Sequence, residues 1–315
     1  MRAGVKVTLT PLLVLCAIAL SICVCLTGCD ASTSDADTQI TTPSTVTVTD
    51  SAGREVTVSF PVERIVSLAP ANTETLFELG LGESVVGVTT YDNYPAPVAD
   101  ITKAGDFISP NFEVIASLEP DLILATGGVQ GETIAALEQS GAPVLVIDPM
   151  SIEEILASFT LIGTATGASE QAEALVARLR EEVDAIQKDA IEVFGESSPH
   201  AFIEIGQNPL FTVGRGTLLD EMLSLAGGTN VVDEPGYVAY SAEQVITANP
   251  QVYFATNGSG VTIEEVIKRE GFADITAVRD GRVILLDEDV VSRPGPRFVE
   301  GIRAFYNGLI ETVDR

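Results

Sequence analysis

Short apolar runs alternate with amphipathic stretches along most of the chain. The apolar runs are rich in Val, Ile and Leu, and each is separated from the next by a stretch compatible with a helix. They lie at residues 64–68, 85–89, 121–125, 143–147, 201–205, 251–254 and 283–286. Because strands that alternate with helices pair in parallel, this pattern predicts β-α units and largely parallel sheets.

Local signals predict where several elements begin and end. Residues 45–50 and 54–60 alternate around Ser51-Ala52-Gly53, which predicts a β-hairpin. Asn72 and Asn111 have side chains that favour N-cap positions, so helices are expected to start there. Capping boxes are expected at 151–154, 241–244 and 262–265, and a final helix from about Arg297 to Val313.

Residues 169–194 contain neither Gly nor Pro and carry apolar positions at helical spacing. A helix of 26 residues is roughly 39 Å long. The predicted fold class is therefore α/β, with two Rossmann-like lobes joined by a single long α-helix and a ligand cleft between the lobes. The expected parts are a signal peptide (1–28), a tether (29–45), an N-terminal α/β lobe (46–168), the linking helix (169–195) and a C-terminal α/β lobe (196–315).

The N-terminal segment has the pattern of a secretion signal. Arg2 and Lys6 precede an apolar run over 7–26, which ends at Leu26-Thr27-Gly28-Cys29. This ending resembles a bacterial lipobox, in which Cys29 is lipidated and becomes the mature N-terminus. The alternative is an uncleaved membrane anchor, because about 20 apolar residues can span a bilayer. Either way, the folded part is expected outside the cytoplasm, attached to the cell membrane.

Cysteine content and charge narrow the possible functions further. Cys16, Cys23 and Cys25 leave with the signal peptide, so the mature protein has no free thiol for a disulfide, a metal or a nucleophile. Losing Arg2 and Lys6 takes the formal net charge from −28 to −30. A nucleic acid is not expected as a partner, because binding it depends on neutralising phosphates with Lys and Arg.

Catalytic and metal-binding patterns are weak. His200 is the only histidine, lies beside Pro199 and is interpreted as a turn residue, so no imidazole metal site can be assembled. Gly214-Arg215-Gly216 lacks the third glycine of a dinucleotide loop and is interpreted as a turn. No set of nucleophile and base stands out. An enzyme is therefore not expected.

One segment recurs in part. "NFEVIASLEPDLILATGG" (111–128) is echoed by "SAEQVITANPQVYFATNG" (241–258), which pairs Glu113 with Glu243. Both glutamates are expected in the first turn of equivalent helices. There a carboxylate interacts favourably with the helix dipole by about 0.3–1 kcal/mol, which explains both residues without any further function.

Several longer stretches carry a family resemblance. "RIVSLAPANTETLFELGLGESVVGVTTYDNYP", "GDFISPNFEVIASLEPDLILATGG", "IEIGQNPLFTVGRGTLLDEMLSLAGGTNVV" and "SRPGPRFVEGIRAFY" resemble the substrate-binding proteins of cobalamin ABC importers, within a wider group that binds ferric siderophores and haem. The resemblance covers about residues 54–313. It implies a monomeric lipoprotein without a cofactor of its own, which captures cobalamin or a related corrinoid for an importer. It also implies that Glu113 and Glu243 dock on the permease dimer.

The resemblance further implies a set of ligand contacts in the cleft. These are Tyr91, Phe107, Phe211, Tyr237 and Asp289. Aromatic side chains suit a broad ring with apolar edges, although the chain has no tryptophan where some relatives carry one. Two alternatives remain open: a ferric siderophore or haem held by Arg215, Arg293 or Arg297 with Tyr91 or Tyr237 as an axial ligand, and a corrinoid-processing enzyme outside the cytoplasm.

Overall fold

The computed structural model describes residues 44–310. These residues belong to one compact unit. The predicted signal peptide, the lipidation site at Cys29 and nearly all of the expected tether lie outside the described residues. Within residues 44–310, no helix combines the length and apolar character needed to cross a bilayer.

The first lobe is built on a five-stranded parallel sheet with the strand order β5-β4-β3-β6-β7. Four of these strands fall on apolar runs of the sequence, as predicted, whereas β5 has only two residues and no such signal. The elements of this lobe are β3 (Ile65–Ser67), α1 (Pro70–Glu78), η1 (Gly82–Ser84), β4 (Val85–Val88), η2 (Ala96–Asp100), β5 (Thr102–Lys103), α2 (Phe112–Ser117), β6 (Leu122–Ala125), η3 (Gly128–Gln130), α3 (Gly131–Glu138), β7 (Val144–Val146) and α4 (Ile152–Thr166).

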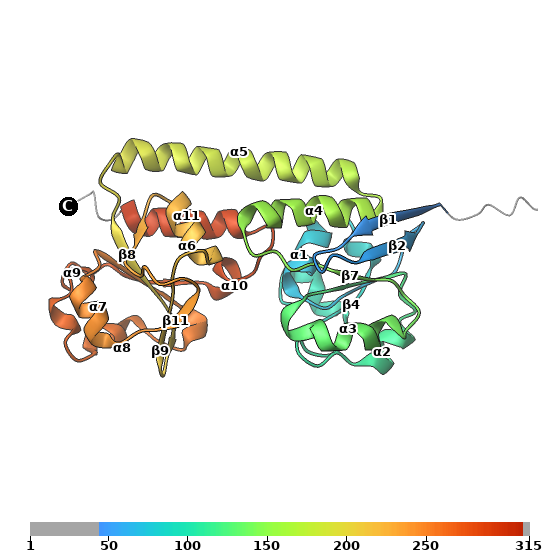
Figure 1. The fold of residues 1–315 in the computed structure, drawn as a ribbon, viewed down its shortest axis with the longest axis horizontal. Coiled ribbons are helices and arrows are strands. Elements are labelled where there is room, and N and C mark those ends of the chain that lie inside the picture. The colour runs from blue at the N-terminus through green and yellow to red at the C-terminus, as the bar shows by residue number, and fades with distance from the viewer. Residues whose placement is uncertain (1–43, 311–315) are drawn as a thin grey trace, which may run out of the picture. The chain divides into compact units, whose positions relative to one another are not determined.

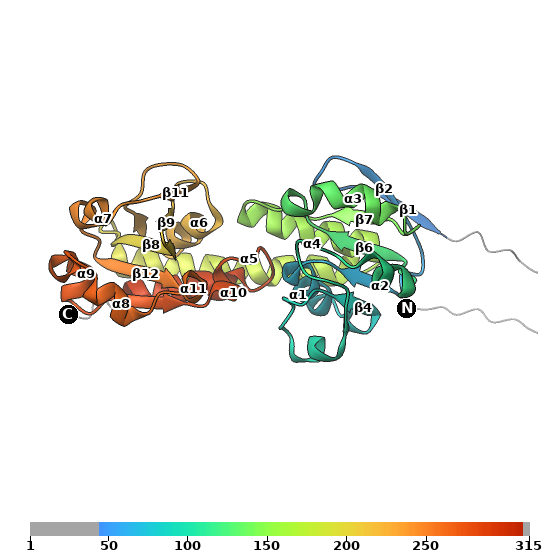
Figure 2. The ribbon, with the colours of Figure 1, turned by 90° about the horizontal axis from the view of Figure 1, so that it is seen from below.

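The predicted hairpin precedes this sheet as β1 (Thr45–Thr49) and β2 (Glu55–Ser59), which pair antiparallel. Its turn lies beside β7, where the Ser51 N–H donates to the Val146 carbonyl at 3.0 Å (Figure 2). Arg54 fastens the same turn, because its guanidinium donates to Asp50 at 2.6 Å and to the Val144 carbonyl at 2.9 Å.

The long helix predicted at 169–194 is confirmed as α5 (Ser169–Phe194). It packs against α4 of the first lobe and against α11 (Phe298–Ile310) of the second lobe (Figure 1). Its contact with α4 is close, since a Cβ on Gly163 would lie 2.5 Å from the Cβ of Ala172. A continuous helix therefore ties together two sheets that share no strand.

The second lobe contains a sheet with the strand order β11-β9-β8-β12-β13, and β10 also pairs with β8. Strands β8, β12 and β13 are parallel, as the βα pattern predicts, whereas β9 runs antiparallel to both β8 and β11. The elements are β8 (His200–Gln207), β9 (Leu210–Val213), α6 (Leu218–Leu225), β10 (Thr229–Asn230), β11 (Tyr237–Ala239), α7 (Ala242–Ala248), β12 (Val252–Thr256), η4 (Asn257–Ser259), α8 (Ile263–Lys268), η5 (Phe272–Asp274), α9 (Thr276–Arg279), β13 (Val283–Leu286), α10 (Glu288–Val291) and α11.

Helix starts agree with the sequence in most places. The Asn111 cap and the capping boxes at Ser241 and Thr262 are confirmed. Ser151 caps α4, but Glu154 accepts a hydrogen bond from the Met150 N–H at 2.7 Å, so the reciprocal bond of a capping box is displaced by one residue.

Two expectations about local structure are wrong. Asn72 is not an N-cap, because α1 already starts at Pro70, whose ring holds the φ angle that a first helical residue needs. His200 is not in a turn. It is the first residue of β8, where its backbone pairs with Thr229 and Gln251.

Candidate ligand-binding site

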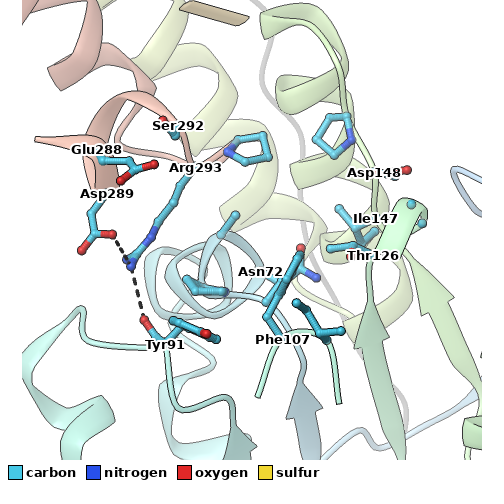
Figure 3. A pocket seen from close by; sticks show the side chains of 18 residues that line it. Asn72, Tyr91, Phe107, Thr126, Ile147, Asp148, Glu288, Asp289, Ser292 and Arg293 are labelled. Carbon is cyan, nitrogen blue, oxygen red and sulfur yellow. Dashed lines mark hydrogen bonds and ion pairs between the residues drawn. The ribbon is translucent and has the colours of Figure 1, made fainter. Parts of the chain in front are cut away.

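A cavity of about 610 Å³ is lined by residues of both lobes (Figure 3). The first lobe contributes Tyr91, Phe107 and Ile147, and the second lobe contributes Glu288, Asp289 and Arg293. Most of these residues follow the carboxyl ends of parallel strands or lie at helix starts, which is where α/β folds bind ligands. The volume is that of an ordinary small-molecule site.

Tyr91 lies on a loop that a buried carboxylate holds in place. Asp92 is 4% exposed, and its Oδ2 accepts hydrogen bonds from the Thr89 N–H, at 2.9 Å, and from the Thr89 hydroxyl. Burial raises the pKa of Asp92, although its hydrogen bonds and Lys103 act in the opposite direction. With the loop fixed in this way, the Tyr91 side chain remains 57% exposed at the cavity.

The backbone of Phe107 is held by a glutamine, Gln130, that the sequence does not single out. The buried Gln130 donates from Nε2 to the carbonyls of Leu68, at 2.7 Å, and Phe107, at 2.8 Å. Its Oε1 accepts from the Thr126 N–H at 2.8 Å. One amide thus connects two strand ends to the loop that carries Phe107, through contacts that no sequence motif signals.

A buried ion pair joins the two lobes beside the cavity. Glu74 of α1 has a side chain that is 1% exposed, and it contacts Arg293 and Arg297, more than 200 residues later in the chain. Arg293 Nη1 donates to Glu74 Oε1 at 2.9 Å. Arg297 donates to both oxygens of Glu74, from Nε at 2.9 Å and from Nη2 at 2.8 Å. Both arginine charges are therefore directed at a protein carboxylate.

Asp289 extends this network along the cavity. Arg293 Nη2 donates to Asp289 Oδ1 at 2.6 Å and to the Tyr91 carbonyl at 3.3 Å (Figure 3). Asn93 of the first lobe donates to Asp289 Oδ2 at 2.7 Å and accepts from Arg293 at 2.9 Å. Arg297 instead lies over the ring of Tyr94, 4.4 Å from its centroid. The two lobes are hence joined by a set of mutually satisfied charges.

Each lobe also supplies one further acid to the cavity wall. Asp148 follows β7, and a Cβ on Gly127 would lie 2.2 Å from its Oδ2. Glu288 follows β13, and its carboxylate rests against Gly258 in the same manner. Partial burial raises the pKa of Asp148, and the nearby negative charge of Glu154 raises it further. Burial and Asp289 raise the pKa of Glu288.

The structure brings together three of the five predicted ligand contacts. Tyr91, Phe107 and Asp289 line the cavity. Phe211 and Tyr237 are not among its lining residues. They lie on β9 and β11, where the antiparallel register places them on one face of the strand pair, 36% and 55% exposed. The sequence did not predict this antiparallel pair, and the pairing rather than the local pattern decides where the two rings lie.

The predicted anion-binding arginines are not free. Arg215 pairs with Asp233 on the surface and does not line the cavity. Arg293 lines it, but together with Arg297 it is held by Glu74. Among residues 44–310, no group of three or more His, Cys, Asp or Glu side chains is arranged to hold a metal ion.

Glu113 and Glu243 occupy equivalent positions in the two lobes. Each is the second residue of a short helix, α2 or α7, after a side-chain N-cap, and each is exposed. Both helices precede the fourth strand in the order of their sheets, β6 and β12, which pairs with the central strand in each lobe. The sequence echo therefore reflects a real structural correspondence between the lobes.

Comparison with known proteins agrees with this architecture. Residues 65–290 match the family model described as "Periplasmic binding protein". The chain is 37% identical over 263 residues to the ABC transporter substrate-binding lipoprotein YvrC of Bacillus subtilis, covering 82% of this chain and 83% of that protein. It is 29% identical over 254 residues to the vitamin B12-binding protein of Salmonella paratyphi A, covering 79% and 91%.

Two solved structures extend the comparison. A possible iron-binding periplasmic solute-binding protein of Staphylococcus epidermidis is 34% identical, with a TM-score of 0.71 and coverage of 79% of this chain and 98% of that one. The haem-binding protein RhuT of Roseiflexus sp. RS-1 is 29% identical, with a TM-score of 0.71 and coverage of 79% and 99%. The chain therefore belongs to the periplasmic binding protein family, the substrate-binding proteins of ABC transporters.

Proposed function

We propose that this protein binds cobalamin or a closely related corrinoid and delivers it to an ABC importer. The relatives include proteins named for vitamin B12, haem and iron, so ancestry alone does not choose among these ligands. The choice of a corrinoid rests on the charges around the cavity.

Haem and many ferric siderophores present carboxylates, which a binding protein commonly meets with arginines. Here Arg293 is the arginine that lines the cavity, and Glu74 and Asp289 already balance its charge. Asp148 and Glu288 add acidic character to the wall. An anionic ligand would therefore meet net repulsion, whereas a ring with uncharged amide side chains would not.

The aromatic side chains fit the same ligand. Tyr91 and Phe107 offer rings at the cavity, and a corrinoid has a broad ring against which they can bury apolar area. Asp148, Glu288 and Asp289 are acceptors that suit the N–H groups of peripheral amides.

Delivery would use the two lobe surfaces that carry Glu113 and Glu243. Their equivalent positions suit a permease built from two similar subunits, with one acid for each subunit. We further propose that the protein acts as a monomer outside the cytoplasm and that a lipid on Cys29 anchors it to the membrane.

Haem is the second candidate, because the exposed phenol of Tyr91 lies at the cavity and could ligate iron. Calorimetry of the purified protein with cyanocobalamin, haemin and a ferric siderophore separates the candidates. We expect one-site saturation with cyanocobalamin and little heat from the others. Saturation with haemin alone would replace the corrinoid proposal with the haem alternative.

A further inference from the structure

Asn72 is a buried residue of the cavity wall whose side-chain Nδ2 has no hydrogen-bond partner within residues 44–310. The residue is 3% exposed, and Figure 3 labels it among the side chains that line the cavity. Proteins rarely leave a buried donor unsatisfied, because its lost hydration is not replaced. The amide therefore has a hydrogen-bonding capacity that the protein's own residues do not use.

The residues that follow Asn72 in α1 are satisfied. Thr73 donates its hydroxyl to Ser67 Oγ at 2.8 Å, and Thr75 donates to the Ala71 carbonyl at 2.8 Å. Glu74 accepts from two arginines. Asn72 is thus an exception within a turn whose neighbouring side chains are all engaged.

Packing between the lobes fixes the position of α1, and with it the place of Asn72 in the cavity wall. Gly295 of the second lobe lies so close to α1 that a Cβ on it would be 3.2 Å from Ala71 Cα. Glu74, three residues after Ala71 and on the same helix face, is held by the second lobe as well. Asn72 is rotated about 100° from Ala71 around the helix axis, and both residues line the cavity.

The start of the helix reinforces the donor character of this wall. Ala69, the N-cap of α1, provides no side-chain acceptor, whereas Asn111 and Thr217 cap their helices with hydrogen bonds. Ala69 and Pro70 line the cavity, so the positive end of α1, which no side chain caps, lies in the same wall as Asn72. Thr126 Oγ1, at the end of β6, is a second buried polar atom of the lining without a partner in the described chain.

We propose that Asn72 is a specificity-determining residue whose Nδ2 donates to an uncharged carbonyl oxygen of the ligand. This proposal rests on the proposed function, in which that oxygen belongs to a peripheral amide of the corrinoid. An uncharged acceptor fits better than a carboxylate, because the acids Asp148 and Glu288 lie in the same lining.

Two substitutions test the role of the amide, with one matched control. Asn72→Asp keeps the shape but exchanges the two N–H donors for acceptors, and Asn72→Ala removes the group without adding charge. Asn307→Asp makes the same chemical change on the exposed face of α11. Calorimetry with cyanocobalamin should show about 10- to 100-fold weaker binding for both Asn72 variants and wild-type affinity for Asn307→Asp.

Thermal unfolding of the free protein separates a ligand contact from a structural role. Because the donor has no partner before binding, Asn72→Ala should keep or raise the melting temperature while it lowers affinity. Unchanged affinity in both variants, or a melting temperature several degrees lower for Asn72→Ala, would overturn the proposal.

Failure of the corrinoid assignment gives a different result, in which the wild-type protein does not bind cyanocobalamin. Haemin then serves as the probe for the same variants. A loss of haemin affinity would keep Asn72 as a donor but overturn the uncharged carbonyl as its partner, and an unchanged affinity would overturn its donor role as well.

Discussion

Glu74 offers the sharpest test of how the two lobes are held together. Its carboxylate is 1% exposed, and it faces Arg293 and Arg297, which are 14% and 13% exposed. Removing one partner of a buried ion pair costs about 3–5 kcal/mol, because the remaining charges stay buried without compensation. Arg293 keeps Asp289 and Asn93, so Glu74→Ala should lower the free energy of unfolding by about 3 kcal/mol, near the low end of that range.

The same helix provides the control. Glu78 also pairs with an arginine, Arg178 at 2.7 Å, but the two side chains are 43% and 50% exposed. Exposed pairs contribute about 0–1 kcal/mol, so Glu78→Ala should change stability little. Urea unfolding followed by circular dichroism measures both variants. If Glu74→Ala came within about 0.5 kcal/mol of Glu78→Ala, a stabilising interlobe ion pair would be refuted.

Glu74→Gln tests whether the charge balance beside the cavity selects the ligand. It keeps the volume and one acceptor but leaves Arg293 and Arg297 with surplus positive charge next to the cavity. Binding of haemin relative to cyanocobalamin should therefore increase in this variant. An unchanged preference in calorimetry would contradict the role assigned to charge in selecting an uncharged ring.

Three further predictions follow from the site. Glu113→Ala/Glu243→Ala should cost the fold at most about 1 kcal/mol per site and leave ligand affinity intact, yet abolish uptake with the cognate transporter in liposomes; normal uptake would leave both acids with only their helix-dipole role. Tyr91→Ala should weaken cyanocobalamin binding by about 1–3 kcal/mol in calorimetry, and by more than Tyr237→Ala, because only Tyr91 lines the cavity; the reverse order would contradict the assigned site. Burial raises the pKa of Asp92, so the folded state holds this proton more tightly than the unfolded chain does, and this residue's contribution to stability falls as pH rises from about 3.8 through the folded pKa. Asp92→Asn should remove this fall in pH-dependent urea unfolding, and an unaltered pH profile would count against it.

Local sequence determined much of this protein. The apolar runs specify strands because each is a short local stretch rich in Val, Ile and Leu. The 26-residue stretch without Gly or Pro specifies α5 because its apolar positions recur at helical spacing. The caps at Asn111, Ser241 and Thr262 depend on contacts within three residues, and they form as the sequence predicts. The paired positions of Glu113 and Glu243 follow from these caps.

Tertiary structure alone decided which side chains meet at the cavity. Glu74 finds Arg293 and Arg297 across more than 200 residues, and periodicity carries no information about such a pairing. The antiparallel pairing of β9 and β11 placed Tyr237 outside the cavity lining, although the family resemblance grouped it with Tyr91. Asn72 is a residue type that favours N-cap positions, yet α1 already starts at Pro70, two residues earlier. The Asn72 amide is instead buried at the cavity, where its Nδ2 has no partner in the described chain. Propensity acts over one turn of backbone, whereas burial and charge pairing are decided by whichever distant segments the fold brings into contact.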